Sequence, residues 1–388
     1  MISFNDTEIA FANKTNEELK KAFVLFKIVA NPTIVKIGKF FTNLAIKIRL
    51  PIEGIVKKTV FHQFCGGESV NDCIPTINKL ADSDIGAILD YSVEGKKNIE
   101  GLDEAKDRII RTIHQAKKFE SIPFAVFKLT GVCTFDFLIN YANNTLTEAD
   151  EPRKKRALGR IGEICEEAAR HEIPIFIDAE ESWIQDAIDD IALNMMRKYN
   201  KEKALIYNTI QFYRKDRLAY LEELHQTCLK EGLHLGVKLV RGAYIEKERK
   251  RAKEKNYPDP IHDTKADTDR DFNTALEYCA AHVDSISFCA GTHNEQSTMK
   301  LIHLMELHEI AKQDKRVYFA QLFGMSDHIS YNLAHEGYLT AKYLPFGPVK
   351  DVLPYIMRRA EENSSIKGQT GRELLLITTE LNRRKLQE

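Results

Sequence analysis

The chain has 388 residues, of which 43% are hydrophobic and 29% charged, and its formal net charge is -1. This profile is typical of a soluble chain that can form one large barrel or two domains, and it gives no reason to expect a nucleic acid as partner. The chain has seven cysteines without a CxxC pair, a polar N-terminus and no run of about 18 apolar residues. We therefore expect a cytoplasmic protein with reduced thiols, no transit peptide and no membrane-spanning helix.

Residues 1–83 are expected to form a helical segment that packs on the domain that follows. Thr15 with Glu18 three residues later makes a capping box, so a helix begins there and ends before Pro32. Three further helices are predicted: Ile34–Leu50, Pro51 to Gly66-Gly67, and Glu68–Leu80. The Lys-rich segment Ile46–Lys58 favours an amphipathic helix packed on a core, with peripheral contact to the inner face of the cell membrane as the alternative.

Residues 84–388 alternate between short apolar runs and helical patterns. The predicted strands are Gly86–Ser92, Phe124–Val132, Pro174–Ala179, Leu205–Phe212, Leu235–Ala243, Ser285–Ala290, Val317–Phe323 and Leu339–Leu344. The predicted helices are Ala105–Lys118, Arg153–His171, Trp183–Tyr199, Arg214–Gly232, Ala266–His282, Glu295–Ile310, Asp327–Gly337 and Pro348–Asn363. Because such runs are typical of parallel strands covered on both faces, we predict an α/β fold, a (β/α)8 TIM barrel. An open doubly wound sheet is the alternative, weakened by the lack of a GxGxxG motif.

Polar residues follow the predicted strands at the end where a (β/α)8 barrel carries its active site. Lys128 and Lys238 interrupt apolar runs, and a lysine is costly to bury unless it is paired. Asp178 follows the third strand. Together these residues indicate a polar barrel mouth that binds an anion, although an ion pair between Lys128 and Asp178 that only stabilises the fold is an alternative.

The stretch LTAKYLPFGPVKDVLPYIMRRAEEN, residues 339–363, combines a strand, a turn and a helix. The turn at Pro345 to Pro348 is expected to break the strand. On the helix, one face carries Tyr355, Arg358, Arg359 and Glu362. Two neighbouring guanidinium groups can hold a carboxylate in a bidentate manner. The alternative is a solvated face with an ion pair from Arg358 to Glu362.

Several motifs, in the same order along the chain, resemble the proline dehydrogenase family, most closely its mitochondrial branch. They are VKLVRGAYIEKER, DPIHDTKADT, THN, QLFGM, YLPFGPV and LPYIMRRAEENSS, and the resemblance covers about residues 60–378. It implies a distorted (β/α)8 barrel that binds FAD, with a final helix over the barrel mouth. It also implies oxidation of L-proline to Δ1-pyrroline-5-carboxylate, the first step of proline catabolism, with electrons passed to a membrane quinone.

The resemblance also implies roles for individual residues. Arg358 and Arg359 resemble the pair that binds the substrate carboxylate, with Lys128 as a third positive group. Asp178 matches an active-site aspartate that positions Lys128 and Tyr343, and Lys238 lies near flavin N5, where a cation stabilises the reduced flavin. The residues that surround the pyrrolidine ring are Tyr244, Leu322, Tyr343 and Tyr355. The residues that contact FAD are Gln211, Lys238, Arg241, Gly242, Ala243, Thr292, His293, Asn294, Gln321 and Glu362. Glu94 is expected to close the site as a partner of Arg358.

Other interpretations stay open. The hydroxyproline-oxidising branch has a smaller residue, typically serine, in place of Tyr343, so we expect proline to be preferred to 4-hydroxyproline. A Schiff-base lyase of the aldolase type would use Lys128 or Lys238 as nucleophile. The barrel could also be an inactive binding module, and the N-terminal helices a surface for a partner. We expect no metal, because neither HExxH nor Cys/His ligand spacing occurs. With no histidine base in evidence, water is expected to take the amine proton.

Overall fold

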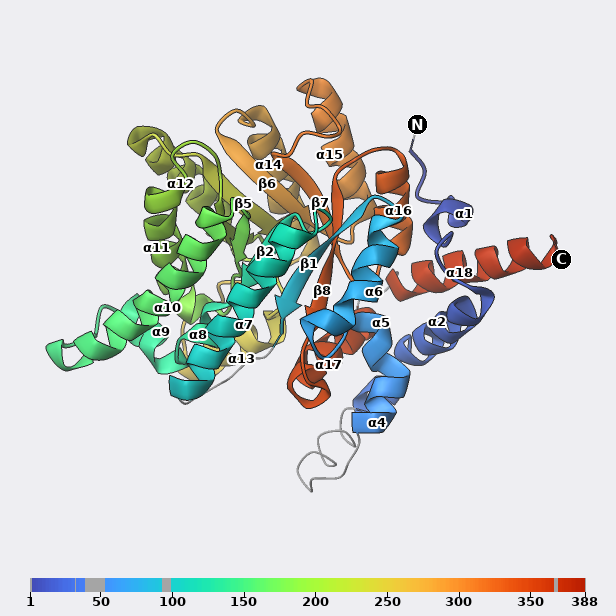
Figure 1. Cartoon of the computed structure of the whole chain (residues 1–388), viewed down its shortest axis with the longest axis horizontal. Coiled ribbons are helices and arrows are strands. Elements are labelled where there is room, and N and C mark those ends of the chain that lie inside the picture. Colours follow the sequence, from blue (N-terminus) through green and yellow to red (C-terminus); the bar gives the residue numbers. More distant parts are fainter. Residues whose placement is uncertain (1, 32, 39–52, 93–98, 366–368, 388) are drawn as a thin grey trace. The chain divides into compact units, whose positions relative to one another are not determined.

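The computed structural model describes residues 2–31, 33–38, 53–92, 99–365 and 369–387 (Figure 1). The chain divides into two compact units, which are described separately. Unit 1 comprises Met1–Val93 and Gln321–Glu388, and unit 2 comprises Glu94–Ala320. Within the described ranges, no helix has the length and apolar character needed to cross a membrane.

Eight parallel strands follow one another around a closed barrel in chain order. They are β1 Ile85–Tyr91, β2 Phe124–Phe127, β3 Ile175–Ile177, β4 Ile206–Gln211, β5 Leu235–Val240, β6 Ile286–Gly291, β7 Val317–Leu322 and β8 Thr340–Phe346. This order confirms the predicted (β/α)8 barrel and excludes the open doubly wound sheet. The strands are short and nearly all buried, because both faces of a parallel barrel strand are covered.

The second strand is shorter than predicted. It ends at Phe127, and the residues assigned to its second half form the short helix α8 Leu129–Val132. Lys128 is the N-terminal cap residue of this helix, and Cys133 N donates to Leu129 O at 2.7 Å. An apolar run by itself fits a buried strand or a buried helix equally well, which is why the prediction was wrong here.

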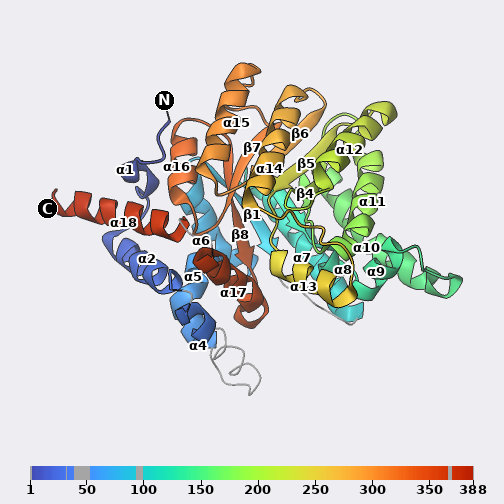
Figure 2. The ribbon, with the colours of Figure 1, turned by 180° about the vertical axis from the view of Figure 1, so that it is seen from behind.

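The helices of unit 2 cover its strands, as α14 and α15 do for β6 (Figure 2). They are α7 Ile99–Lys118, α8, α9 Phe135–Ala142, η2 Glu148–Asp150, α10 Glu151–Arg170, α11 Ser182–Tyr199, α12 Arg217–Glu231, α13 Ile245–Lys255, α14 Lys265–Ala281 and α15 Glu295–Leu307. The predicted helices of this unit are confirmed with shifted ends. Helices α9 and α13 were not predicted; α13, IEKERKRAKEK, buries only Glu248 and Ala252 and so lacks an apolar stripe.

Unit 1 contains β1, β8 and the helices at both ends of the chain. These are α1 Thr7–Ala10, α2 Asn16–Val29, α4 Glu53–Val56, the π-helical η1 Lys57–Phe61, α5 His62–Phe64, α6 Val70–Ala81, α16 Asp327–His335, α17 Val349–Ser365 and α18 Gln369–Lys385. The predicted capping box at Thr15 and Glu18 is confirmed. Helices α2 and α18 lie side by side (Figures 1 and 2) and share a core that includes Phe26 and Ile377. Most of the predicted helix Ile34–Leu50 lies outside the described residues.

Strand β8 continues through the proline that was expected to end it. Pro345 pairs with Asp90 and Phe346 with Tyr91 along β1. Proline lacks an N–H, but its carbonyl oxygen accepts from Gly66 N at 2.9 Å, and Phe346 O accepts from Ser92 N at 3.2 Å. The strand instead ends at Gly347, whose φ of 145° is accessible to glycine and costly for other residues.

Candidate active site

A buried ion pair lies at the carboxyl ends of two strands in unit 2. Asp178 follows β3 and is 8% exposed, and Lys238 of β5 is 6% exposed. Lys238 Nζ donates to Asp178 Oδ1 and lies 4.9 Å from the centre of the Phe176 ring. Asp178 was expected to position Lys128, and the structure adds Lys238 as its partner. Because each charge compensates the other, the cost of burying the pair is reduced.

Thr209 adds an unsatisfied hydroxyl beside this ion pair. It lies on β4 at the position that pairs with Lys238 of β5. Its Oγ1 is buried and, among the described residues, has no hydrogen-bond partner. The preceding side chain, Asn208, is bonded to Asp189 at 2.8 Å and Tyr220 at 3.1 Å. A buried hydroxyl usually has a partner, so Thr209 is a candidate to bond a polar ligand group.

Glu180 is a buried carboxyl group that the sequence-based prediction of the site did not include. It accepts a hydrogen bond from the backbone N–H of Thr130 at 3.0 Å and another from the Thr130 hydroxyl. Its own carbonyl oxygen accepts from Gln211 Nε2 at 2.7 Å, so Gln211, a predicted cofactor contact, is fixed by this segment. Burial raises the pKa of Glu180 to about 7, although the bonds from Thr130 oppose the shift. The acidic run after β3, Glu180-Glu181, was the sequence feature that could have identified this residue.

Arg241 organises the strand ends of β5 and β6. Its guanidinium donates to Asp269 Oδ1 at 2.6 Å, Thr292 Oγ1 at 2.7 Å and Ser297 Oγ at 2.8 Å. Burial lowers its pKa, and Asp269 opposes that shift. Thr292 Oγ1 also accepts from Asn294 N at 3.1 Å. The structure thus brings together three of the residues predicted to contact FAD, and Asp269 and Ser297 are partners that the prediction missed.

Gly242 follows Arg241 in a backbone conformation that requires glycine. Its φ is 128°, and a Cβ atom would lie 2.5 Å from the ring of Tyr213. The next residue, Ala243, is exposed, and Tyr244 is the N-terminal cap residue of α13. His293 lies half-buried between Thr292 and Asn294. Gly242 is therefore required both by its backbone conformation and by the close packing of the Tyr213 ring.

Unit 1 contains two aromatic residues and two arginines that were predicted to bind the substrate. Tyr355 and Arg359 lie one turn apart on α17, are 6% and 7% exposed, and the Arg359 Cζ lies 5.2 Å from the centre of the Tyr355 ring. Arg358 is half-buried. The alternative of a solvated helix face is therefore wrong for Arg359. The side chain of Glu362 and all of Glu94 lie outside the described residues.

Of the predicted wall residues, Leu322 lies at the end of β7 and Tyr343 in the middle of β8. Tyr343 is 8% exposed, and its carbonyl oxygen accepts from Phe323 N at 2.9 Å. Gln321, a predicted cofactor contact, accepts a hydrogen bond from Ser330 Oγ at 2.7 Å. These residues of unit 1 are thus held by backbone and side-chain bonds within that unit.

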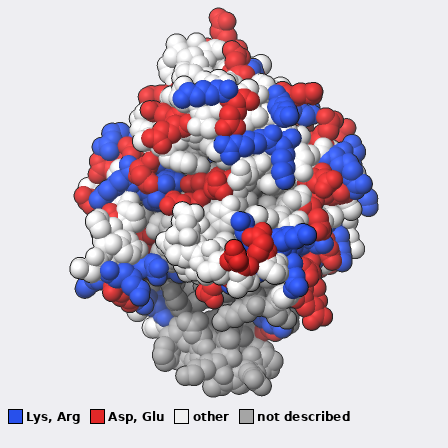
Figure 3. Space-filling model, turned by 90° about the vertical axis from the view of Figure 1, so that its left-hand side faces the viewer, with Lys and Arg blue, Asp and Glu red and all other residues white. Residues whose placement is uncertain are grey.

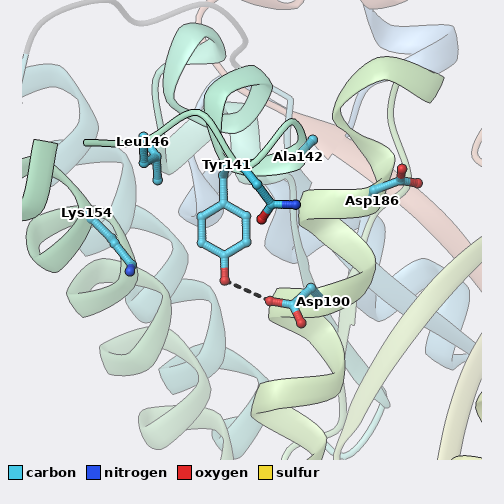
Figure 4. A pocket seen from close by; sticks show the side chains of 7 residues that line it. Tyr141, Ala142, Leu146, Lys154, Asp186 and Asp190 are labelled. Atoms are coloured by element: carbon cyan, nitrogen blue, oxygen red, sulfur yellow. Dashed lines mark hydrogen bonds between the residues drawn. The ribbon is translucent and has the colours of Figure 1, made fainter. Parts of the chain in front are cut away.

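Two other polar clusters lie on the outer helices of unit 2. A hollow of about 590 Å³ is lined by α9, α10 and α11, where the Tyr141 hydroxyl donates to Asp190 at 2.7 Å (Figure 4). No predicted site residue lines it. Elsewhere Glu167 Oε1 lies 2.5 Å from His114 Nε2 and 3.0 Å from His171 Nε2, and Arg170 bonds the same carboxylate. We interpret this cluster as a surface ion-pair network. One face of the molecule shows acidic and basic side chains interleaved (Figure 3).

Comparisons with known proteins agree on one family. The model of the family "Proline dehydrogenase" matches residues 73–372. A carbapenem antibiotics biosynthesis protein, CarD, of Pectobacterium carotovorum is 35% identical over 83% of this chain and 83% of its own length. The mitochondrial proline dehydrogenase 1 of Dictyostelium discoideum is 31% identical over 98% of this chain and 74% of its own.

A solved structure supports the fold. Proline utilization A (PutA) from Bdellovibrio bacteriovorus has a TM-score of 0.71 at 18% identity over 92% of this chain, which spans 38% of that protein. At this identity the likeness concerns the fold alone. The family match covers most of the sequence and the relatives match over most of their length, so this chain belongs to the proline dehydrogenase family.

Proposed function

We propose that this protein oxidises L-proline to Δ1-pyrroline-5-carboxylate with bound FAD and passes the electrons to a membrane quinone, as the first step of proline catabolism. The observation that carries the proposal is Arg359, an arginine buried on α17 in a chain of the proline dehydrogenase family. A guanidinium group can bind a carboxylate in a bidentate manner, and an amino-acid substrate has a carboxylate.

Substrate binding is assigned to the positive and aromatic groups named above. Arg358 and Arg359 bind the carboxylate as a planar fork, with Lys128 as a third positive group, and fix the orientation of the substrate. Tyr244, Leu322, Tyr343 and Tyr355 surround the ring and exclude water. Glu94 is proposed to close the site. The buried positions of Tyr343 and Tyr355 support this assignment.

The strand ends of unit 2 fit a flavin dinucleotide. Gly242 allows close backbone approach, Arg241 supplies positive charge, and the Thr209 hydroxyl lacks a partner among the described residues. We assign cofactor binding to these strand ends, to Gln211, Ala243, Thr292, His293, Asn294 and Gln321, and to Glu362. When bound, FAD supplies the electron sink that no side chain can provide. Lys238, held by Asp178, provides a cation where negative charge develops.

Proton removal from the substrate amine is proposed to occur to water, because no histidine base was identified beside the proposed substrate residues. The pH dependence of kcat/KM tests this. We expect the same rising limb in the wild type and in Asp178→Ala, and a flat profile in the variant would identify Asp178 as the base.

Peripheral membrane association would bring the enzyme to a quinone. Helix α2 supports this, because Val24 and Ile28 are 55% and 45% exposed and Lys20, Lys21 and Lys27 lie exposed near them. Co-sedimentation with vesicles that contain anionic lipids tests the proposal. Val24→Ser/Ile28→Ser should reduce binding, and equal binding would overturn this role of α2.

The related activity, oxidation of 4-hydroxyproline, is disfavoured by Tyr343. A hydroxyproline dehydrogenase of Xenopus laevis is 27% identical over 99% of this chain. The buried phenol of Tyr343 should crowd a ring hydroxyl. We therefore expect a higher kcat/KM for proline, and comparable values for both substrates would refute the steric argument.

The decisive experiment is an anaerobic titration of the purified protein with L-proline. The flavin absorbance should bleach as proline is added. A colourless protein that cannot take up FAD would overturn the proposal. In that case borohydride trapping with a carbonyl substrate would test for the lyase that uses Lys128 or Lys238.

A further inference from the structure

Unit 1 contains a cluster of buried charges that the proposed chemistry does not use. Lys342 of β8 is fully buried, and its Nζ lies 2.8 Å from Asp327, the first residue of α16. Lys14, which precedes α2, reaches the same carboxylate at 3.2 Å. Glu373 of α18 is 3% exposed and accepts from Ser326 N at 2.5 Å. The cluster thus joins β8 and the start of α16 to segments near both ends of the chain.

The cluster holds the turn that follows β7. Lys342 Nζ donates to Met325 O at 2.6 Å, and Gln63 Nε2 donates to Gly324 O at 2.8 Å. Ser326 has a φ of 52°, a left-handed conformation that a serine adopts only when its surroundings enforce it. A Cβ atom on Gly324 would lie 1.8 Å from the carbonyl oxygen of Gln63. The turn therefore depends on bonds from neighbouring elements for its shape.

The same turn joins the two residues that were assigned to the substrate ring. Leu322 begins it, and Met325 N donates to Leu322 O at 3.2 Å. Tyr343 is the neighbour of Lys342 on β8, and Phe323 N donates to its carbonyl oxygen at 2.9 Å. The Lys342 ammonium and the Tyr343 carbonyl are therefore two adjacent attachments between the turn and the strand. Loss of the ammonium would remove the first of these attachments.

Asp327 compensates the charge of the buried Lys342 ammonium group. Burial lowers its pKa, and Asp327 opposes that shift. Although burial alone would raise it, Lys342 and Lys14 hold the pKa of Asp327 well below its usual range. An apolar residue of similar size could fill this space without the cost of desolvation. A charged lysine in this place is explained by the hydrogen bond that it donates to Met325.

We propose that Lys342, held by Asp327, is a positioning residue that fixes Leu322 and Tyr343 and thereby sets the preference for proline over ring-substituted analogues. This inference rests on the assignment of Leu322 and Tyr343 to the substrate ring. Lys342 contacts neither substrate nor cofactor. It acts through the turn at residues 322–326 and through its neighbour on β8.

The test is Lys342→Met in the full-length, FAD-loaded enzyme, with kinetics for L-proline and 4-hydroxy-L-proline. Methionine keeps the length and removes the charge and the donor. We expect KM for proline to rise about tenfold with a nearly unchanged kcat, since a small displacement of a positioning group has such effects. The kcat/KM ratio of proline to 4-hydroxyproline should fall in parallel. Bound FAD and its visible spectrum should stay unchanged.

The matched control is Arg217→Met in unit 2. Arg217 is also buried, at 6% exposed, and bonds Asp189 at 2.6 Å on the outer helices. It should lower the melting temperature without changing the substrate ratio. A Lys342→Met enzyme that melts earlier but keeps the wild-type ratio would overturn the proposal. If Lys342→Met does not fold, Lys14→Met and Asp327→Asn should give smaller shifts of the same ratio, and unchanged ratios in both would overturn it as well.

Tyr343→Ser separates this inference from the site assignment. If Tyr343→Ser leaves the ratio unchanged, the assignment of Tyr343 to the ring is wrong. If Tyr343→Ser lowers the ratio and Lys342→Met does not, the assignment stands and the positioning role of Lys342 is wrong.

Discussion

The two units each contain a buried lysine within an apolar strand, and we assign the two lysines different roles: one binds a ligand and the other stabilises the fold. Lys238 of β5 and Lys342 of β8 both interrupt apolar strands, and each bonds an aspartate. Lys342 also donates to Met325 O. Lys238 lies beside Thr209, whose hydroxyl has no partner among the residues that the structure describes. A bond to a turn carbonyl fits a lysine that shapes the fold, whereas the Thr209 hydroxyl beside Lys238 is a candidate partner for a ligand.

Lys238→Met should have the largest effect and tests this contrast directly. We expect the rate of flavin reduction by saturating L-proline to fall about 10²–10³-fold, because a cation near the developing negative charge is lost. Anaerobic stopped-flow absorbance measures it. Lys300→Met removes a half-buried lysine on an outer helix of the same unit and should change nothing. A rate within twofold of wild type would indicate that Lys238, like Lys342, has a structural role.

Arg359→Lys asks whether a buried cation of unit 1 also faces a ligand. The substitution keeps the charge but removes the planar fork, so we expect kcat/KM for proline to fall about 100-fold, mostly through KM. Steady-state kinetics measures the split, and Arg383→Lys, on the largely exposed end of α18, is the control. Unchanged kinetics would mean that Arg359 has a structural role.

Gly242→Ala tests cofactor approach at the strand ends of unit 2. Both the φ of 128° and the Tyr213 ring oppose a Cβ atom there, so we expect FAD to bind roughly tenfold more weakly. Gly232→Ala is a suitable control, because Gly232 has a φ of 66° but no atom within 4 Å of the added carbon. Flavin content after dialysis compares them. Equal loss of bound flavin in both variants would show that backbone strain alone explains the weaker FAD binding.

Glu180→Gln has the smallest expected effect and concerns stability. Burial raises the pKa of Glu180 from 4.5 to about 7, so between these values the unfolded chain is ionised at this group while the folded chain is protonated. The wild type therefore loses stability as pH rises through this window, and glutamine does not. At pH 8 the variant should be more stable by about 3 kcal/mol, with little difference at pH 4.5. Urea unfolding at both pH values measures this, and a constant difference would contradict it.

Local sequence patterns determined most of the fold and the types of residue in the site. The eight strands, the capping box at Thr15 and the arginine pair on α17 were all readable, because they depend on short-range periodicity and on side-chain chemistry. The burial of Arg359 could not be predicted from the sequence, since an exposed helix face has the same residue spacing. The end of β8 at Gly347, two residues beyond Pro345, depended on pairing with β1.

Only the tertiary structure decided which charges meet. Asp178 and Lys238 are 60 residues apart, and the pairing of Lys342, Asp327 and Lys14 joins distant parts of the chain. The raised pKa of Glu180 likewise comes mainly from burial, to which the neighbouring carboxylate of Glu181 adds. A sequence states which groups can ionise, but desolvation and distance, which decide what those groups do, exist only after the chain has folded.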